Sequence, residues 1–255
     1  MGIMEGKKGL VVGVANERSI AWGIAQACAR EGAEVGYTFA GEILEKRVRP
    51  LAEQTGSTFV HQMDVTSEDE MDHVFGLAKE HFGTLDFLVH AVAFSDKSEL
   101  KGRYADTSKK NFLNTMDVSV FSFTSMARRG AALMPNGGAM VTLTYYGAQK
   151  VITNYNVMGV AKAALEASVK YLAVDLGGDN IRVNALSAGP IKTLASAGIA
   201  DFKELLGQGV LRAPLKRNVT LEEVGQAGLY LCSDMSTAVT GECLFVDCGY
   251  QVTGV

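Results

Sequence analysis

Residues 9–23 read GLVVGVANERSIAWG, which is an apolar run, a polar turn and the start of a second apolar pattern. We expect a strand over Gly9–Val14 and a helix over Ile20–Arg30, because β-branched residues fill the first run and apolar residues recur at helical spacing in the second. A dinucleotide-binding fold places its phosphate-binding turn between such elements, where the N–H groups of the helix start are free. The ordinary G-x-G-x-x-G pattern is absent, so spacing alone leaves open a plain strand–turn–helix with Ser19 as N-cap.

Outward from this stretch, short apolar runs alternate with longer helical patterns. Further strands are expected at 34–39, 57–62, 85–91, 139–144, 181–186 and 242–246. Helices are expected at 42–54, 68–82, 109–132, 154–175 and 221–232, and Ser67 and Glu70 form a capping box before the second of these. No linker, repeat or charge block divides the chain. The pattern predicts an α/β fold in which residues 1–255 form a single domain around a Rossmann-like, doubly wound parallel sheet.

The composition limits the classes of function. The 255 residues include 24 basic and 28 acidic side chains, and 47% are hydrophobic. Such a chain buries a large core, and its net charge of −4 argues against nucleic-acid binding. The apolar runs fall far below the ~20 residues of a membrane-spanning helix, and residues 16–18 interrupt the first run too early for a signal peptide. We therefore expect a cytoplasmic protein that has no membrane segment.

Cysteine and histidine positions predict no metal site. The four cysteines contain no C-x-x-C pair, so we expect reduced and mostly buried thiols, with a Cys243–Cys248 disulfide as the alternative. The four histidines lack the spacing of metal ligands, which favours structural roles for them.

Five segments together resemble one family. They are GVANERSIAWG (13–23), MDV (63–65), HAVAF (90–94), YNVMGVAK (155–162) and IRVNALSAGPIKTLA (181–195). In this order the segments resemble those of bacterial NADH-dependent enoyl-[acyl-carrier-protein] reductases, divergent members of the short-chain dehydrogenase/reductase superfamily. The resemblance extends over almost the whole chain. It implies a reductase that uses NADH to reduce the 2,3 double bond of trans-2-enoyl thioesters in bacterial type II fatty acid biosynthesis.

The resemblance also implies where NADH binds. Ser19 and Ile20 would face the pyrophosphate. The position of Gly23 after the turn, taken by itself, predicts close packing of the helix on a strand. The Asp64 carboxylate would accept from the adenine amine, although its position alone also suits a turn residue at a strand end. The residues implied at the cofactor are Gly13, Ser19, Ile20, Ala40, Asp64, Val65, Val92, Lys162, Ile191, Thr193, Leu194 and Ala195.

Cofactor choice is predicted from the end of the strand at 34–39. Ala40 and Gly41 follow it, so no arginine stands there to bind the 2′-phosphate of NADPH. Lys46, Arg47 and Arg49 lie further into the next helix. We therefore expect NADH to be preferred over NADPH.

Two Tyr/Lys pairs compete for the catalytic role. Tyr146-x3-Lys150 has the spacing of most short-chain dehydrogenases, but residues 151–154 after it continue a helix poorly. Tyr155-x6-Lys162 spans about two helical turns, so both side chains lie on one helix face. This second spacing is also the one found in the enoyl reductase family.

The resemblance assigns roles to this second pair. Tyr155 would hydrogen-bond the developing enolate oxygen, Lys162 would bind the nicotinamide ribose, and Tyr145 would orient the substrate. The alternative for Lys162 is an ordinary charged helix face, because Glu166 and Lys170 follow it at i+4 and i+8.

The substrate side is implied by the resemblance as well. A connection at about 191–206 would close over the acyl chain, and the residues implied at the substrate are Ser95, Met158, Ile199 and Phe202. The acyl group would be carried on an acidic carrier protein, toward which Lys203 is the one obvious basic contact near this loop. The helix at 154–175 is apolar nearly all round, which together with the resemblance implies contacts between subunits of a homotetramer.

Two other functions compete with this interpretation. A 3-oxoacyl reductase of the same superfamily needs a serine about thirteen residues before its catalytic tyrosine, and Leu133 stands there relative to Tyr146. A nucleotide-sensing protein would keep the sheet and lose the chemistry, and the presence of both Tyr155 and Lys162 argues against that.

Overall fold

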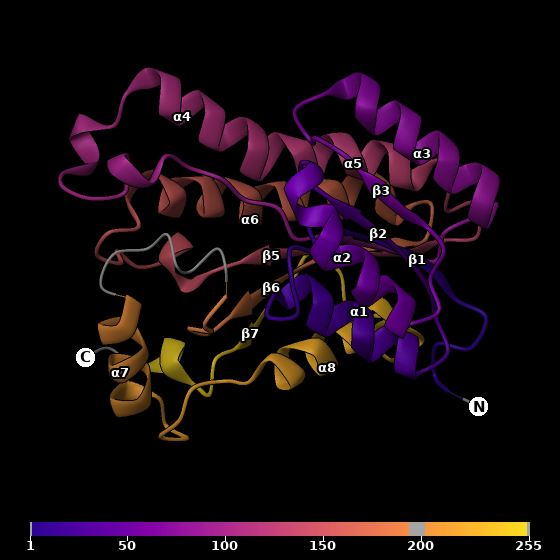
Figure 1. Ribbon diagram of the computed structural model, residues 1–255. Coiled ribbons are helices and arrows are strands. Elements are labelled where there is room, and N and C mark those ends of the chain that lie inside the picture. Colours follow the sequence, from indigo (N-terminus) through magenta and orange to yellow (C-terminus); the bar gives the residue numbers. More distant parts are fainter. Residues whose placement is uncertain (1, 194–201, 254–255) are drawn as a thin grey trace.

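Seven parallel strands form one sheet in the order β3-β2-β1-β4-β5-β6-β7. The computed structural model describes residues 2–193 and 202–253 (Figure 1). The strands are β1 Lys8–Val12, β2 Glu34–Phe39, β3 Val60–Gln62, β4 Phe87–His90, β5 Gly138–Thr144, β6 Ile181–Ala188 and β7 Cys243–Val246. This arrangement confirms the predicted Rossmann-like α/β fold class.

The strand order reverses between β1 and β4. Val12, the last residue of β1, pairs with Thr38 of β2 on one side and with His90 of β4 on the other. Chain segments that leave these strands diverge to opposite sides, and such a switch point opens a crevice outside the carboxyl ends of the strands. The segments that contain the candidate site residues begin at the carboxyl ends of the strands of this sheet.

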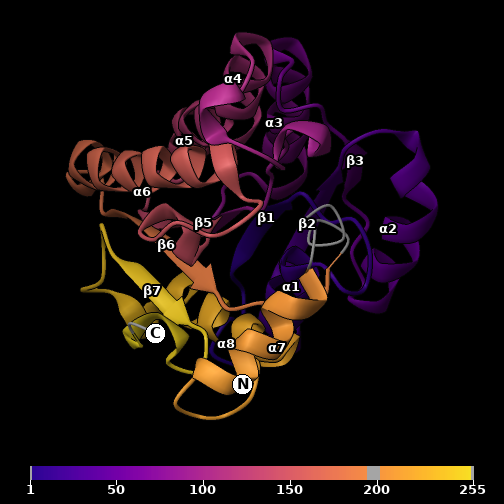
Figure 2. The same cartoon turned by 90° about the vertical axis from the view of Figure 1, so that its left-hand side faces the viewer.

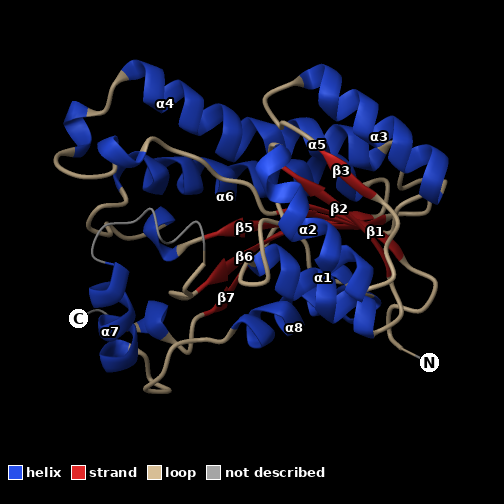
Figure 3. Cartoon of the chain, in the orientation of Figure 1, coloured by secondary structure: helices blue, strands red, loops and turns tan. Residues whose placement is uncertain are grey.

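Helices cover both faces of the sheet (Figures 1 and 3). The group α3, α4, α5 and α6 lies on one face, and α1, α2 and α8 lie on the other. Their bounds are α1 Ile20–Arg30, α2 Glu42–Gln54, α3 Glu68–Phe82, α4 Lys109–Met116, α5 Ser122–Ala131, α6 Asn156–Gly177, α7 Phe202–Arg212 and α8 Leu221–Cys232. Each face has its own apolar core, and these cores contain Phe123 and Leu165 on the first face and Ile24 and Val141 on the second.

Helices α1 and α8 touch through glycines. A Cβ atom on Gly225 would lie 2.5 Å from the carbonyl oxygen of Gly23, and one on Gly23 would lie 3.0 Å from that of Leu221. A Cβ atom on Gly228 would lie 2.5 Å from a side-chain carbon of Ile24. The prediction that Gly23 permits packing against a strand is therefore wrong, because its close neighbour is another helix.

Several strand ends differ from the predicted ones. β1 ends at Val12 rather than Val14, because Gly13 turns the chain out of the sheet with φ +98°. β3 and β4 begin two or more residues later than predicted, whereas β6 continues to Ala188.

The helical regions hold two further differences. The predicted helix at 109–132 is interrupted by a π-helical turn, η3, at Asp117–Phe121. Helix α7 occupies part of the segment for which a loop was predicted. The capping box before α3 is half formed: Ser67 accepts from Glu70 N, but the Glu70 carboxylate accepts from Asp64 N at 2.8 Å.

All four cysteines are free thiols, as predicted, so the Cys243–Cys248 disulfide is absent. Cys28 and Cys232 are buried, and Cys243 and Cys248 are partly exposed. Over the residues that the structure describes, no helix is long and apolar enough to cross a membrane.

Candidate active site

The turn between β1 and α1 approaches the end of β4 closely. A Cβ atom on Gly13 would lie 2.4 Å from the carbonyl oxygen of Ala91 and 3.0 Å from the Val92 side chain. Gly13 therefore meets two requirements at once, a left-handed backbone and a backbone contact that leaves no room for a side chain. This turn brings two of the residues implied at the cofactor, Gly13 and Val92, side by side.

Ser19 stands at the N-cap of α1 but does not cap it. Its hydroxyl donates to the Asn16 carbonyl at 2.6 Å and makes no hydrogen bond to the first helical turn. The simple N-cap interpretation of Ser19 is therefore wrong. The first turn, which begins at Ile20, has no acidic residue either, so its N–H groups and the positive end of the helix dipole suit a pyrophosphate.

Asp64 and Val65 follow the carboxyl end of β3. One Asp64 oxygen accepts from the Thr66 amide at 2.9 Å and from the Thr66 hydroxyl at 2.8 Å. Glu70 accepts from the backbone N–H of Asp64, so two carboxylates fix this turn. Asp64 thus has the local turn contacts of the structural alternative, and its side chain is exposed.

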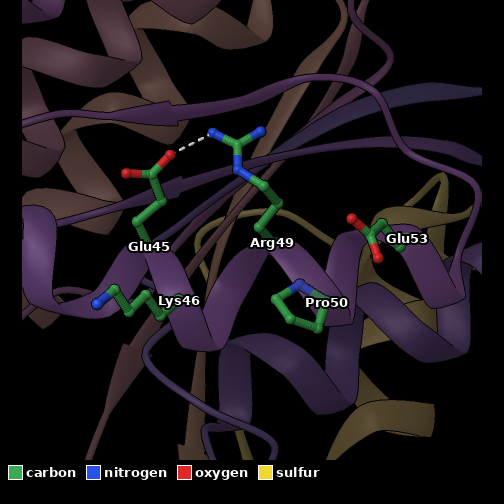
Figure 4. A pocket seen from close by; sticks show the side chains of 5 residues that line it. All are labelled: Glu45, Lys46, Arg49, Pro50 and Glu53. Atoms are coloured by element: carbon green, nitrogen blue, oxygen red, sulfur yellow. Dashed lines mark hydrogen bonds and ion pairs between the residues drawn. The ribbon is translucent and has the colours of Figure 1, made fainter.

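The basic residues after β2 lie along α2. Ala40 is exposed, and Gly41 turns the chain into the helix with φ +76°. Figure 4 shows an open hollow on α2 whose lining is Glu45, Lys46, Arg49, Pro50 and Glu53. All five residues belong to one helix, and Arg49 is paired with Glu45, so the hollow is a feature of the helix surface.

Tyr145 and Tyr155 meet at the end of β5 and the start of α6. Their ring centroids are 5.2 Å apart and the ring planes are at 73°. The Tyr145 hydroxyl is buried and has no hydrogen-bond partner among the described residues. Burial raises the pKa of both tyrosines above the ordinary value, so both hydroxyls keep their protons at neutral pH. A buried donor without a partner costs free energy unless a ligand satisfies it.

The backbone around Tyr155 is shaped by asparagines and glycines. Asn154 and Asn156 on either side have φ values of +61° and +33°, a region that asparagine tolerates better than most residues. A Cβ atom on Gly147 would lie 2.5 Å from the Tyr155 ring, and one on Gly159 would lie 2.8 Å from the Gly147 carbonyl. These contacts fix the place of the Tyr155 ring.

Lys162 lies in the second turn of α6 after Tyr155 and is buried, with 6% of its surface exposed. Its ammonium donates to the Leu143 carbonyl at 2.7 Å. Burial lowers the pKa of Lys162 to about 8, and the Glu166 carboxylate acts in the opposite direction. Glu166 itself accepts from the Thr144 hydroxyl at 2.7 Å. A lysine held in this way does not belong to an ordinary charged helix face, so that alternative fails for Lys162.

The competing pair has a different environment. The Tyr146 ring packs against Phe245 and Tyr250, with centroids at 6.4 and 5.9 Å. Lys150 is exposed. Tyr146 thus has a packing role, and the lysine of its pair is not buried.

Three polar side chains that sequence reasoning missed hold the segment after β4. Ser119 bonds both the N–H and the carbonyl of Phe94, and Asn111 accepts from the Asp96 N–H at 2.9 Å. Between them, Thr115 donates to the Ser95 hydroxyl at 2.9 Å. Positions 111, 115 and 119 repeat at the i, i+4 spacing of one helix face, which is the signal that could have revealed them. The Ser95 side chain is therefore committed to this buried stripe.

The structure describes some of the remaining predicted residues, and others lie outside the described ranges. Met158 is buried on the first turns of α6, and Ile191 and Thr193 are partly exposed after β6. Leu194, Ala195 and Ile199 lie outside the described residues, and for Phe202 only its place at the start of α7 is described.

His90 has a clear structural role. His90 is buried and contacts the hydroxyls of Thr142 at 2.8 Å and Ser122 at 2.9 Å. Burial lowers the pKa of His90 to about 3, with the charge of Lys162 as a further cause, so its ring is neutral. In the described part of the chain no three His, Cys, Asp or Glu side chains are grouped as metal ligands.

These observations fit a dinucleotide: a glycine turn without side-chain room, an uncapped helix start, and, at the end of β5 and on α6, a tyrosine hydroxyl without a partner and a buried lysine. Together with the strand order, they define an oxidoreductase of the short-chain dehydrogenase/reductase class. A family model described as "Enoyl-(Acyl carrier protein) reductase" matches residues 13–251. The chain belongs to this enoyl-(acyl carrier protein) reductase family.

Individual relatives agree with this assignment. The chain is 57% identical, over 99% of its length and 97% of the relative's, to the protein of Rickettsia felis named enoyl-[acyl-carrier-protein] reductase [NADH] FabI. It is 58% identical to enoyl-[acyl-carrier-protein] reductase [NADH] 1 of Rhizobium meliloti, over 100% of this chain and 93% of that one.

Solved structures are similar over the full chain. The enoyl reductase of Anaplasma phagocytophilum in complex with NAD superposes with a TM-score of 0.96 at 57% identity, covering 100% of this chain and 97% of that one. The Bacillus cereus enzyme with NADP+ and an indole naphthyridinone gives a TM-score of 0.98 at 48% identity, with both chains covered completely.

Proposed function

We propose that this chain uses NADH to reduce the 2,3 double bond of trans-2-enoyl thioesters carried on acyl carrier protein, a step of bacterial type II fatty acid biosynthesis. The observation that carries the proposal is the cluster of Tyr145, Tyr155 and buried Lys162 at the carboxyl edge of the sheet. Family membership supports the same reaction.

Tyr155 is the proposed catalytic residue. Bound NADH supplies hydride to C3 of the enoyl group, and negative charge then develops on the thioester oxygen. Because the pKa of Tyr155 is raised by burial, its hydroxyl remains a donor throughout the working pH range. A neutral donor aimed at the oxygen stabilises the transition state more than the ground state. Tyr145, whose hydroxyl lacks a partner, is proposed to orient the thioester.

Lys162 is the proposed ligand of the nicotinamide ribose. Its ammonium has one described hydrogen bond, to Leu143, and can donate up to three. The charge would also favour the anionic oxygen that forms nearby. The phosphate region is proposed to lie over Gly13, Ser19 and Ile20, beside Val92.

The rest of the proposed cofactor and substrate contacts come from the family resemblance. Ala40, Asp64 and Val65 are proposed on the adenosine side, and Ile191, Thr193, Leu194 and Ala195 on the nicotinamide side. Ser95, Met158, Ile199 and Phe202 are proposed around the acyl chain, in one domain of residues 1–255 whose loop at about 191–206 closes over it.

A homotetramer in the cytoplasm is the proposed state. In support, Tyr171 and Val174 on α6 are 76% and 81% exposed, and Leu113 and Phe121 on the adjoining helix are 55% and 54% exposed. Large apolar side chains concentrated on neighbouring helices are typical of a subunit interface. Measurement of molar mass in solution tests this state.

Oxidation of NADH with two substrates tests the proposed reaction. We expect rapid oxidation with a crotonyl thioester and little with an acetoacetyl thioester. Preference for acetoacetyl thioester would indicate a 3-oxoacyl reductase, and binding of NADH without turnover of either would indicate a nucleotide sensor. Both results would contradict the proposal.

A further inference from the structure

The connection between β4 and α4 carries a concentration of positive charge. Residues 97–110, here named the basic segment, contain five basic side chains: Lys97, Lys101, Arg103, Lys109 and Lys110. All five are exposed. The protein as a whole has a net charge of −4, so this local excess runs against the rest of the chain.

Two carboxylates in and beside the segment, Asp96 and Glu99, accept hydrogen bonds within this region, and Asp106 is a further, exposed acidic residue. Glu99 accepts from the amide and the hydroxyl of Ser108, both at 2.8 Å. Asp96 accepts from the amide and the hydroxyl of Ser98 at 2.9 and 2.7 Å. Within the described part of the chain, none of the five basic side chains forms an ion pair. Their charges are therefore directed to solvent and available to a partner.

The basic segment lies directly beside the proposed catalytic tyrosine. The side-chain amide of Asn156, the residue after Tyr155, donates to the carbonyls of Glu99 at 3.5 Å and Gly102 at 3.3 Å. In Figures 1 and 2 the segment lies at the end of the molecule where α6 begins. Two large side chains next to the charges, Phe94 and Tyr104, are 52% and 47% exposed. Apolar anchors surrounded by charged groups are the usual composition of a docking surface.

The opposite side of the site offers less positive charge. The sequence pointed to Lys203, but Glu204 adjoins it in the chain. Arg217, further along, is paired with Glu223 at 2.6 Å. Lys192, Arg212 and Lys216 are exposed basic residues there that have no ion pair among the described residues.

We propose that the basic segment 97–110 is the docking surface for the acidic carrier protein that delivers the enoyl thioester. The inference rests on the proposed function and adds the surface to it. Positive charge at the mouth of the site would attract a strongly acidic partner from a distance and orient it before contact. The thioester would then enter past Phe94 toward Tyr155.

A charge-reversal variant tests this surface. We compare the wild-type protein with K97E/K101E/R103E, using crotonyl-acyl carrier protein and the uncharged crotonyl-N-acetylcysteamine thioester as substrates. The expected result is a KM for the carrier substrate raised about tenfold or more, with kinetics on the small thioester unchanged. The wild-type KM for the carrier should also rise with salt, and this dependence should weaken in the variant.

Matched controls give the remaining outcomes. R30E/R47E/K79E changes the charge equally at exposed positions elsewhere, and its KM for the carrier should stay near the wild-type value. An unchanged KM in K97E/K101E/R103E, or an equal rise in the control, would overturn the proposed docking surface. A rise confined to R212E/K216E would overturn it as well and place docking beside α7. In each of these outcomes the wild-type protein still reduces the small thioester. If the wild type did not reduce it, the proposed function itself would be contradicted.

Discussion

The ring edge of Tyr145 meets the ring of Tyr155 at a centroid distance of 5.2 Å, although the two residues belong to different elements. Tyr145 follows β5 and Tyr155 precedes α6. Each ring shields the other from water, which contributes to the raised pKa of both hydroxyls. The arrangement places two neutral hydroxyl donors on adjoining, buried rings.

Loss of the Tyr155 hydroxyl should impair chemistry more than binding. Tyr155→Phe is expected to lower kcat for a crotonyl thioester by about 10²–10³-fold, the usual cost of one oxyanion donor. The dissociation constant for NADH should stay close to the wild-type value, as measured by fluorescence titration. Tyr146→Phe is the matched control and should have little effect, because that ring packs against Phe245 and Tyr250. The reverse pattern would assign the chemistry to Tyr146.

Lys162 should make NADH binding depend on pH. Since burial lowers its pKa to about 8, the ammonium is lost as the pH rises through 8, well before an exposed lysine loses its proton. We expect kcat/KM for NADH, which reports the free enzyme, to fall above about pH 8. Lys162→Met should lower kcat/KM at neutral pH and remove this dependence. The exposed Lys170→Met is the control; a wild-type profile that stays flat to pH 10 would contradict the assignment.

NADH should be preferred to NADPH. Arg49 is paired with Glu45 on α2, and exposed Ala40 offers no charge to a 2′-phosphate. We expect kcat/KM to favour NADH by about tenfold or more, equivalent to about 1.4 kcal/mol. The Bacillus cereus relative has been solved with NADP+, so both cofactors should be measured at the same ionic strength. A preference for NADPH would implicate Lys46 and Arg47, and their removal would then reverse it.

The polar stripe at 111, 115 and 119 should affect the substrate side alone. Thr115→Val removes a buried donor to Ser95 and is expected to cost about 1–3 kcal/mol in the free energy of unfolding. The KM for the thioester should rise and the KM for NADH should not. Thr115→Ser keeps the hydroxyl and should restore most of both properties. Equal changes in the two KM values would show that the stripe supports the whole fold rather than the 94–96 segment.

His90 should contribute to acid sensitivity. Its pKa is about 3 in the folded protein and about 6.5 when unfolded, so the unfolded state takes up a proton first as the pH falls. The wild type therefore loses about 2–3 kcal/mol of stability through this residue between pH 7 and pH 4.5. His90→Asn lacks this loss. The difference in the free energy of unfolding between wild type and variant, measured by urea titration, should therefore narrow from pH 7 to pH 4.5. A difference that stays constant would mean that His90 has the same pKa in the folded and unfolded states, and would contradict the lowered pKa.

Local signals explain which parts of the fold could be predicted. The bounds of α1, α2 and α8 follow from apolar periodicity and clear breaks, and they agree with the structure. Tertiary contacts decided the features that were missed: η3 lets Ser119 reach Phe94, and α7 forms in a segment whose helical signal is weak. Ser19 is of a residue type that favours the N-cap position, but its hydroxyl donates to the Asn16 carbonyl instead. Propensity describes which conformations a segment favours, whereas the partner of a particular hydroxyl depends on the folded neighbourhood.

The glycine contacts between α1 and α8 constrain how this protein can change through mutation. Gly225 cannot gain a side chain alone, because a Cβ atom there would lie 2.5 Å from the Gly23 carbonyl oxygen; a side chain on Gly23 would in turn require Leu221, 3.0 Å away, to shift. A variant must shift both helices together, and a shift of α1 would move the turn at Gly13 that leads into it. Random mutagenesis should therefore recover paired changes across this crossing rather than single ones. Ancestral reconstruction should find the two glycines gained or lost as a unit.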